Sequence, residues 1–468
     1  MRTQEVLVFA LLLSLSVAVA QTTGTEETAA QAQQKDWLIM VYMTADNDLE
    51  KYAIDDMNEM EVGLKSAIDG EANSRIESAR ASGTSVTPEM EEQIKQQAAQ
   101  DVTSRATVVV QVDRWAGGTS RYDDKSNGNW TGTKRYVITP DMTNTTGDAR
   151  KIDSTMVMDL GEVNMGDPNN AKDFETWAME NYAANNTAVI YWNHGSGWKW
   201  GENEVTDSKS GTKSVGYDYG GDGKDPSTRN DALTPMEMDQ IHASVGKVDI
   251  IGFDACLMQM AEHAYQYQDD ASILIGSEEV EPGNGWTYDP IVAAAFSGAS
   301  PKDLAKVTVD SYEGPTLSAI DTAKAAGITN SLDALIKELG TSKNSDKVLK
   351  AYKDAMRFED SEYGDLYSFA DNIEKAGLGK NVTSAAKNLK GSINGAVIAK
   401  HTEGEYSGTG GISIWMPLEN NKTDFNNYSE LGISGGTSWD ETVTNEVEVN
   451  QAQKTSGQVV GYDEWWRN

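Results

Sequence analysis

A histidine and a cysteine each stand at the end of a buried-strand pattern in this sequence. His194 follows the apolar run TAVIYWN (187–193), and Cys256 closes the run VDIIGFDAC (248–256). Ligands of open α/β sheets bind outside the carboxyl ends of the strands, so neighbouring strands would bring the imidazole and the thiol to one crevice. A thiolate attacks as a nucleophile, and an adjacent imidazole generates it and then protonates a leaving amine. The two residues therefore predict cysteine catalysis.

Glycines lie next to the histidine. Gly195 and Gly197 allow a substrate carbonyl to approach the backbone closely, and the N–H groups of Gly195 and Cys256 could form an oxyanion hole. Taken singly, each reactive residue has a structural interpretation, as a packed histidine or an inert buried cysteine. Taken together, they favour the catalytic interpretation.

The remaining histidines are weaker candidates for the same chemistry. His242 and His263 fall within helical patterns, and His401 is expected in a late loop. One cysteine and four scattered histidines offer no zinc-ligand spacing, so we expect no metal in the catalytic step. The single cysteine also rules out an internal disulfide.

Strand and helix patterns alternate along the chain, which predicts a largely parallel sheet with helices on both faces, a three-layer α/β/α domain. Residues 63–105 are expected to be a helical insertion within a catalytic domain that spans 36–300. Helical patterns dominate 301–420, which should complete the fold, and 421–468 is expected to be a polar tail. The expected strands are 37–43, 107–115, 133–141 in a hairpin, 187–193, 248–256, one that begins at 272 and ends in the acidic loop before 286, 395–400 and 410–417. The expected helices are 49–60, 171–183, 234–245, 257–268, 301–312, 330–339, 348–358 and 385–389.

The N-terminus has the order of a secretory signal. Arg2 precedes an apolar run at 6–13, and a small-x-small cleavage pattern closes the segment at 18–20. We therefore expect a signal peptide over 1–20, a disordered segment or propeptide over 21–35, and a location outside the cell or in its envelope. The apolar run is shorter than the roughly 20 residues of a spanning helix.

The chain is strongly acidic. Its formal net charge is −34, from 39 basic and 73 acidic residues. Nucleic acids and anionic membranes carry the same sign of charge, so neither is expected to be the main partner. Cationic substrates remain compatible with this charge.

Six segments stand out together: WLIMVYMTADNDLE, LGEVNMGDP, YWNHGSGW, FDACLM, GSEEVEPGNGW and GISIWMP. They resemble the clostripain family of cysteine peptidases, which belongs to the caspase–gingipain–legumain fold group. The resemblance extends from about Trp37 to Pro417 and is most specific at HGSGW and DACLM. It implies a caspase-like fold, His194 and Cys256 as the catalytic dyad, and Gly195 in the oxyanion hole.

The resemblance also implies self-processing between His194 and Cys256. Residues 200–233 form a polar, glycine-rich stretch of the kind in which nicking concentrates, although a merely disordered surface loop is the alternative. The family and the acidic loop YDYGGDGKD (217–225) keep calcium open as a cofactor, without EF-hand spacing. The candidate processing sites are Lys209, Lys213, Lys224 and Arg229.

Asp254 is the candidate for substrate recognition. Residues two apart in a strand point to the same face, so we expect the Asp254 carboxylate to share the crevice with the Cys256 sulfur. It would then pair with a substrate lysine or arginine through charge-assisted hydrogen bonds, as the resemblance also implies. The alternative is that Asp254 caps a helix that begins near Leu257.

These features predict a secreted cysteine endopeptidase that cleaves proteins or peptides after arginine or lysine. The alternative function is an exported binding protein on a catalytically inactive caspase-like scaffold. Thiol alkylation would discriminate between the two, because an activated cysteine reacts rapidly near neutral pH and an inert buried one does not.

Overall fold

The computed structural model describes residues 34–115, 125–141, 151–200, 214–218, 231–340, 345–419, 421–444 and 447. Every element described below belongs to one compact unit, residues 35–468. The expected signal peptide (1–20), residues 21–33 and the end of the expected tail lie outside the described residues. Within the described ranges, no helix combines the length and the apolar character needed to cross a membrane.

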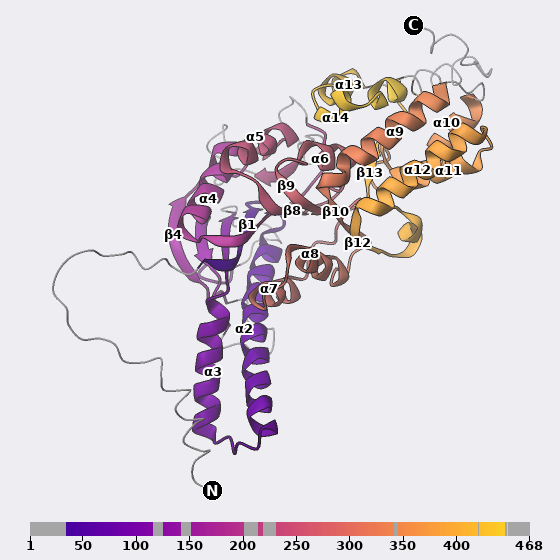
Figure 1. Ribbon diagram of the computed structural model, residues 1–468. Coiled ribbons are helices and arrows are strands. Elements are labelled where there is room, and N and C mark those ends of the chain that lie inside the picture. Colours follow the sequence, from indigo (N-terminus) through magenta and orange to yellow (C-terminus); the bar gives the residue numbers. More distant parts are fainter. Residues whose placement is uncertain are drawn as a thin grey trace, which may run out of the picture. The chain divides into compact units, whose positions relative to one another are not determined.

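A nine-stranded sheet forms the centre of this unit (Figure 1). Its strands are β1 (Lys35–Ala45), β2 (Ala106–Arg114), β3 (Gly132–Val137), β4 (Thr155–Gly161), β5 (Ala184–Trp192), β8 (Val248–Asp254), β9 (Ala271–Gly276), β10 (Thr316–Asp321) and β12 (Val397–Thr402). The order across the sheet is β12-β10-β9-β8-β5-β1-β2-β3-β4. The five central strands from β9 to β2 are parallel, and the outer strands pair antiparallel with their neighbours. The predicted, largely parallel sheet is confirmed.

The central strands are nearly continuous apolar runs because both faces of the sheet are covered. Alternate residues of β1 enter different cores: Leu38 and Met40 lie in one, and Ile39 and Val41 lie in the other. Helices α2, α7 and α8 cover the Ile39 side, and α4, α5, α6 and the C-terminal helices cover the Leu38 side (Figure 1). The helices are α2 (Glu50–Ala81), α3 (Pro88–Thr103), α4 (Pro168–Asn181), α5 (Pro235–Val245), α6 (Ala261–Gln266), α7 (Tyr288–Phe296), α8 (Pro301–Asp310), α9 (Ala325–Gly340), α10 (Ser345–Lys353), α11 (Leu366–Lys375), α12 (Lys380–Ala396), α13 (Lys422–Tyr428) and α14 (Gly432–Gly436). The predicted three-layer arrangement is therefore confirmed.

The helical prediction for 63–105 is confirmed, but its separation from the preceding helix is wrong. One helix, α2, runs through both segments, and α3 lies beside it (Figure 1). α2 continues through Gly63. The glycine allows α2 and α7 to pack closely, because a Cβ at this position would lie 2.4 Å from the carbonyl oxygen of Asp289 in α7.

The C-terminal part adds β10 and β12 to the sheet. A strand was expected at β12, from the run at 395–400, but not at β10. GGISIWMP forms β13 (Ser413–Trp415), but this strand pairs with β11 (Tyr363–Asp365) in a separate small sheet. Residues 421–444 are not merely polar, because they form α13 and α14 and bury Tyr428 and Trp439 in the core. The first half of the expected tail thus belongs to the folded unit.

Candidate active site

His194 and Cys256 emerge from adjacent strands at the same level. β5 and β8 are parallel neighbours, and their register places Trp192 opposite Asp254, two residues before each reactive side chain. The imidazole, the thiol and Asp254 line one pocket of about 250 Å³. The structure therefore brings three of the predicted site residues together. The other lining residues are Leu49, Trp192, Asn193, Ala255, Val280, Glu281, Pro282, Gly283 and Gly285.

Backbone N–H groups surround the thiol. The N–H of Glu281 donates to Cys256 Sγ at 3.3 Å, and the N–H groups of Gly195 and of Cys256 itself also interact with the sulfur. Burial raises the pKa of the Cys256 thiol, and these donors only partly oppose the rise. The thiol form therefore predominates at neutral pH, and a base is needed to produce the nucleophile.

The chain turns sharply directly after the sulfur. Leu257 has a φ of 65°, in the left-handed region that non-glycine residues rarely adopt. Its N–H donates to the carbonyl oxygen of Glu279 at 3.2 Å, which holds the turn. Backbone strain of this kind is concentrated at functional sites, where the surrounding structure maintains it.

Glycine at position 195 is required by the close approach of two strand ends. A Cβ on Gly195 would lie 2.3 Å from the carbonyl oxygen of Cys256 and 3.0 Å from the Cβ of Ala255. Either the β5 loop or the cysteine loop would have to move to admit a side chain. The two residues predicted to supply an oxyanion hole, Gly195 and Cys256, are thus in direct contact.

The imidazole of His194 hydrogen-bonds to a residue that sequence analysis did not identify. Its Nε2 lies 2.8 Å from Oδ1 of Asp48, and the two side chains are 36% and 40% exposed. Asp48 comes from the polar segment TADNDLE after β1, which is the neighbour of β5 on the side opposite β8. Asp48 could have been found from the sequence, because it lies in a polar segment that follows a third buried-strand pattern, and ligands bind at such strand ends.

Asp254 forms part of the buried wall of the pocket. The residue is 4% exposed, and its carboxylate accepts hydrogen bonds from the Tyr288 hydroxyl at 2.8 Å and the Trp286 N–H at 3.2 Å. Burial raises the pKa of Asp254 to about 6, although hydrogen bonds from Glu281, Tyr288 and Trp286 lower it in part. The carboxylate therefore lies where the strand argument placed it, beside the thiol.

The alternative role for Asp254, as a helix cap, is wrong. The helix expected over 257–268 is only α6, which begins at Ala261 with Met260 at its N-cap position. Residues 257–260 separate Asp254 from this helix, and among the described residues no side chain caps it.

Two further carboxyl groups interact with Asp254, and neither was identified from the sequence. Glu281 hydrogen-bonds with Asp254, and Asp56 accepts a hydrogen bond from the Trp192 indole at 2.6 Å. Burial, and then the charge of Asp254, raise the pKa values of both Glu281 and Asp56. The acidic loop GSEEVEPGNGW indicated carboxylates after β9, but not that one would fold back onto the end of β8.

The candidate processing sites are not placed by the structure. Lys209, Lys213, Lys224 and Arg229 lie outside the described residues. Residues 215–218 form strand β6 (Val215–Asp218), which pairs with β7 (Asp231–Leu233). The expectation of a loop throughout 200–233 is therefore wrong at these two strands.

The other histidines do not contribute to the pocket lining. His242 is buried and contacts the Tyr191 hydroxyl, and Nδ1 of His263 lies 2.7 Å from the carbonyl oxygen of Met258. His401 lies in β12 at the sheet edge, so its expected place in a loop is wrong.

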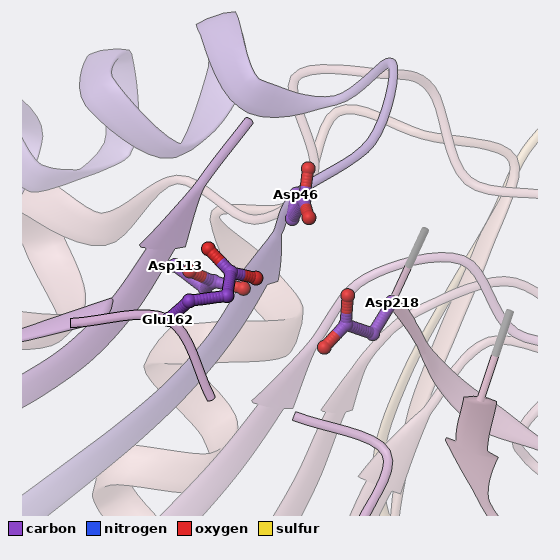
Figure 2. A group of neighbouring side chains, drawn as sticks. All are labelled: Asp46, Asp113, Glu162 and Asp218. Atoms are coloured by element: carbon purple, nitrogen blue, oxygen red, sulfur yellow. The ribbon is translucent and has the colours of Figure 1, made fainter. Parts of the chain in front are cut away.

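Four carboxylates from separate elements converge on one another, as Figure 2 shows. Asp46 follows β1, Asp113 lies in β2, Glu162 follows β4 and Asp218 ends β6. Each offers an oxygen that lies within 4.8 Å of the others, and all except Glu162 are buried.

The donor set of this carboxylate cluster suits a hard cation. Oδ1 of Asp113 accepts a hydrogen bond from the Thr133 hydroxyl at 2.9 Å, whereas its buried Oδ2 has no hydrogen-bond partner among the described residues. Burial, together with the charges of Asp218, Glu162 and Asp46, raises the pKa of Asp113. Carboxylate oxygens are the ligands that calcium prefers, and a cation would offset this repulsion.

Comparison with models of protein families identifies the family of this chain. The model of the clostripain family matches residues 41–445. The chain belongs to the clostripain family. It is a cysteine protease, and the family membership that the sequence motifs suggested is confirmed.

Clostripain relatives are similar in sequence and in fold. The protein named clostripain from Hathewaya histolytica is 23% identical over 436 residues, which cover 81% of this chain and 74% of that relative. A secreted C11 cysteine protease from Bacteroides thetaiotaomicron, solved with an irreversible peptide inhibitor, superposes with a TM-score of 0.59 at 19% identity and covers 87% of this chain and 99% of its own. An inactive zymogen C11 protease from Parabacteroides distasonis gives a TM-score of 0.56 at 14% identity, covering 86% of this chain and 98% of its own. The caspase-like fold is thereby confirmed.

Proposed function

We propose that this clostripain-family protease is a secreted endopeptidase that cleaves after arginine or lysine, with His194 and Cys256 as its catalytic dyad. The observation that carries the proposal is the single pocket in which the thiol, the imidazole and the buried Asp254 carboxylate meet. The similarity to clostripain supports the same reaction.

The proposed reaction begins with transfer of the thiol proton to the imidazole. The Cys256 thiolate then attacks the scissile carbonyl carbon, and the oxyanion forms beside the N–H groups of Gly195 and Cys256. The imidazolium gives its proton to the leaving amine as the C–N bond breaks, which leaves a thioester on Cys256. Water, deprotonated by the same imidazole, hydrolyses the thioester and restores the thiol.

The dyad is tested with Cys256→Ala and His194→Ala on peptides that contain arginine or lysine. Each variant should lose at least about 1,000-fold in kcat/KM, because nucleophile and base act as a unit. His401→Ala is the matched control and should retain wild-type activity, since this histidine lies at the sheet edge. Retained activity in either dyad variant would exclude the mechanism.

Self-processing within 200–233 is part of the proposal. It is supported by the lysines and the arginine of this polar segment and by the zymogen state of the Parabacteroides distasonis relative. Cys256→Ala protein should remain a single band, while the wild type converts to two. Conversion of Cys256→Ala in the absence of any other protease would refute self-cleavage.

We also propose that calcium binds the carboxylate cluster of Asp46, Asp113, Glu162 and Asp218. Bound there, calcium would neutralise carboxylates from four elements and tie β6 to the central sheet. Calcium should raise the melting temperature of the wild type and sensitise terbium luminescence when terbium replaces it. Asp113→Asn should lose both effects, and Asp69→Asn, which changes a surface carboxylate on α2, should keep them. A wild type that shows neither response has no such site.

Secretion is proposed from the N-terminal pattern, and a secreted relative of the same fold supports it. Mass spectrometry of the exported protein should find Gln21 as the first residue before any further processing. A mature protein that still begins at Met1 would contradict cleavage of the signal.

A further inference from the structure

Three adjacent strands end in a thiol, an imidazole and a carboxylate. In the sheet order β8-β5-β1, Cys256 follows the first strand, His194 the second and Asp48 the third. The histidine therefore comes from the middle strand, between the strand that leads to the nucleophile and the strand that leads to the carboxylate.

The contact between Asp48 and His194 distinguishes the two imidazole nitrogens. Oδ1 of Asp48 lies 2.8 Å from Nε2 of His194. A carboxylate accepts hydrogen bonds only, so this contact favours the tautomer with its proton on Nε2 and leaves the lone pair on Nδ1. The same carboxylate stabilises the imidazolium once Nδ1 has gained a proton.

The backbone that presents Asp48 is held by its neighbour Asn47. Nδ2 of Asn47 donates to the carbonyl oxygens of Thr44 at 2.9 Å and Tyr217 at 2.8 Å. Oδ1 of Asn47 accepts a hydrogen bond from the Leu49 N–H at 2.8 Å, which forms a local side-chain turn around Asp48. The hydrogen bonds of Asn47 therefore hold the turn that carries the Asp48 carboxylate.

We propose that Asp48 is a positioning residue that selects the reactive tautomer of His194. The proposal rests on the dyad proposed above. The thiol proton moves from Sγ to Nδ1, Asp48 keeps its hydrogen bond with Nε2–H, and the proton on Nδ1 later passes to the leaving amine. No proton is transferred to Asp48 in any step.

The test compares Asp48→Asn, Asp48→Ala and Asp48→Glu, with Asp69→Asn as a control for the loss of one surface charge. Rates are normalised to active sites titrated with an irreversible peptide inhibitor. Asp48→Asn and Asp48→Ala should lower kcat roughly 10- to 100-fold and leave KM within about twofold, a smaller loss than the ~10⁴-fold of a buried triad aspartate because water can partly replace an exposed carboxylate. Asp48→Glu should recover part of the loss.

A spectroscopic measurement separates positioning from a merely structural role. Nitrogen-15 NMR of histidine-labelled protein, assigned with His194→Gln, should show the proton on Nε2 in the wild type and a tautomer mixture in Asp48→Asn. Unchanged kcat, or the same tautomer in Asp48→Asn, would overturn the proposal. A higher kcat in the Asp48 variants would also overturn it, because Asp48 would then hold His194 in a less reactive position. If His194→Ala itself stays active, the dyad fails as well.

Discussion

Three buried carboxyl groups are gathered near the candidate nucleophile. Asp254, Glu281 and Asp56 lie together on the buried side of the pocket, and the hydrogen bond between Asp254 and Glu281 lets the pair share a proton. A substrate guanidinium or ammonium that enters this pocket would relieve the repulsion among them. An uncharged side chain would leave it in place, so the empty pocket itself favours a cation.

Asp254→Asn should therefore reduce activity only on basic substrates. With matched peptides that differ by arginine or norleucine before the cut bond, kcat/KM for arginine should fall roughly 10- to 100-fold, the range for a hydrogen bond to a charged group. The norleucine peptide should be cleaved at a nearly unchanged rate. Equal losses on both peptides would mean that Asp254 only supports the loops around it.

The pH dependence of KM should report the same carboxyl group. The pKa of Asp254 is about 6 in the empty pocket, and only its ionised form can pair with a cation. KM for the arginine peptide should rise as the pH falls below about 6, and KM for the norleucine peptide should not. Asp254→Asn should abolish the difference between the peptides. A KM for arginine that is flat between pH 5 and 7 would contradict this assignment.

Gly195→Ala tests the close approach of the two strand ends. A Cβ 2.3 Å from a carbonyl oxygen must displace one of the two loops, so kcat/KM should fall roughly 100-fold through misplacement of the reacting groups. Gly391→Ala is the matched control, because its Cβ would meet no atom within 4 Å in α12. That helical substitution should stabilise the protein by about 0.5–1 kcal/mol and leave activity unchanged.

At the scale of elements, the segment after His194 is anchored by the C-terminal part. The Tyr363 hydroxyl donates to the carbonyl oxygen of Ser196 at 2.6 Å, and Lys199 contacts Asp360 at 2.8 Å and Glu362 at 2.9 Å. Burial lowers the pKa of Lys199, but the two carboxylates outweigh burial and keep it above its ordinary value. The orientation of the β5 loop therefore depends on residues more than 150 positions later in the chain.

Lys199→Met should weaken this anchor. Its side chain is 9% exposed and its partners are about a quarter exposed, so the loss should be about 2 kcal/mol, less than the 3–5 kcal/mol of a fully buried pair. Urea unfolding measures it. Lys337→Met, which breaks a pair on the surface of α9, should change the free energy of unfolding by less than about 1 kcal/mol. Equal losses of unfolding free energy in the two variants would show that Lys199 contributes no more than a surface ion pair.

The central strands could be predicted from sequence because burial on both faces leaves long apolar runs. β4 could not, since its residues are mostly exposed, and β6, β7 and β11 are too short to show a pattern. His194 and Cys256 could be found because each follows a strand. Asp48 and Glu281 could not, because their roles arise from contacts between elements that a single sequence does not pair.

At the scale of the molecule, the proposed cut would fall between two strands that remain neighbours. β5 and β8 pair over five residues from Ala188 to Trp192, and Trp198 packs against Trp415 and Tyr428. A chain cut within 200–233 should therefore elute from a sizing column at the position of the intact protein. Separation of the fragments without denaturant would show that the sheet does not hold them.

β4 has a consequence for handling the purified enzyme. Among the described strands it is the last at its end of the sheet, and it exposes Met156 by 48% and Val157 by 40%. Such an edge can add a strand from another molecule, which is how sheets aggregate. The charge of −34 keeps copies apart at neutral pH, and acid weakens that repulsion by protonating carboxylates. Concentrated stocks should therefore precipitate first at mildly acidic pH and high salt, and the substitution Val157→Lys should extend their shelf life.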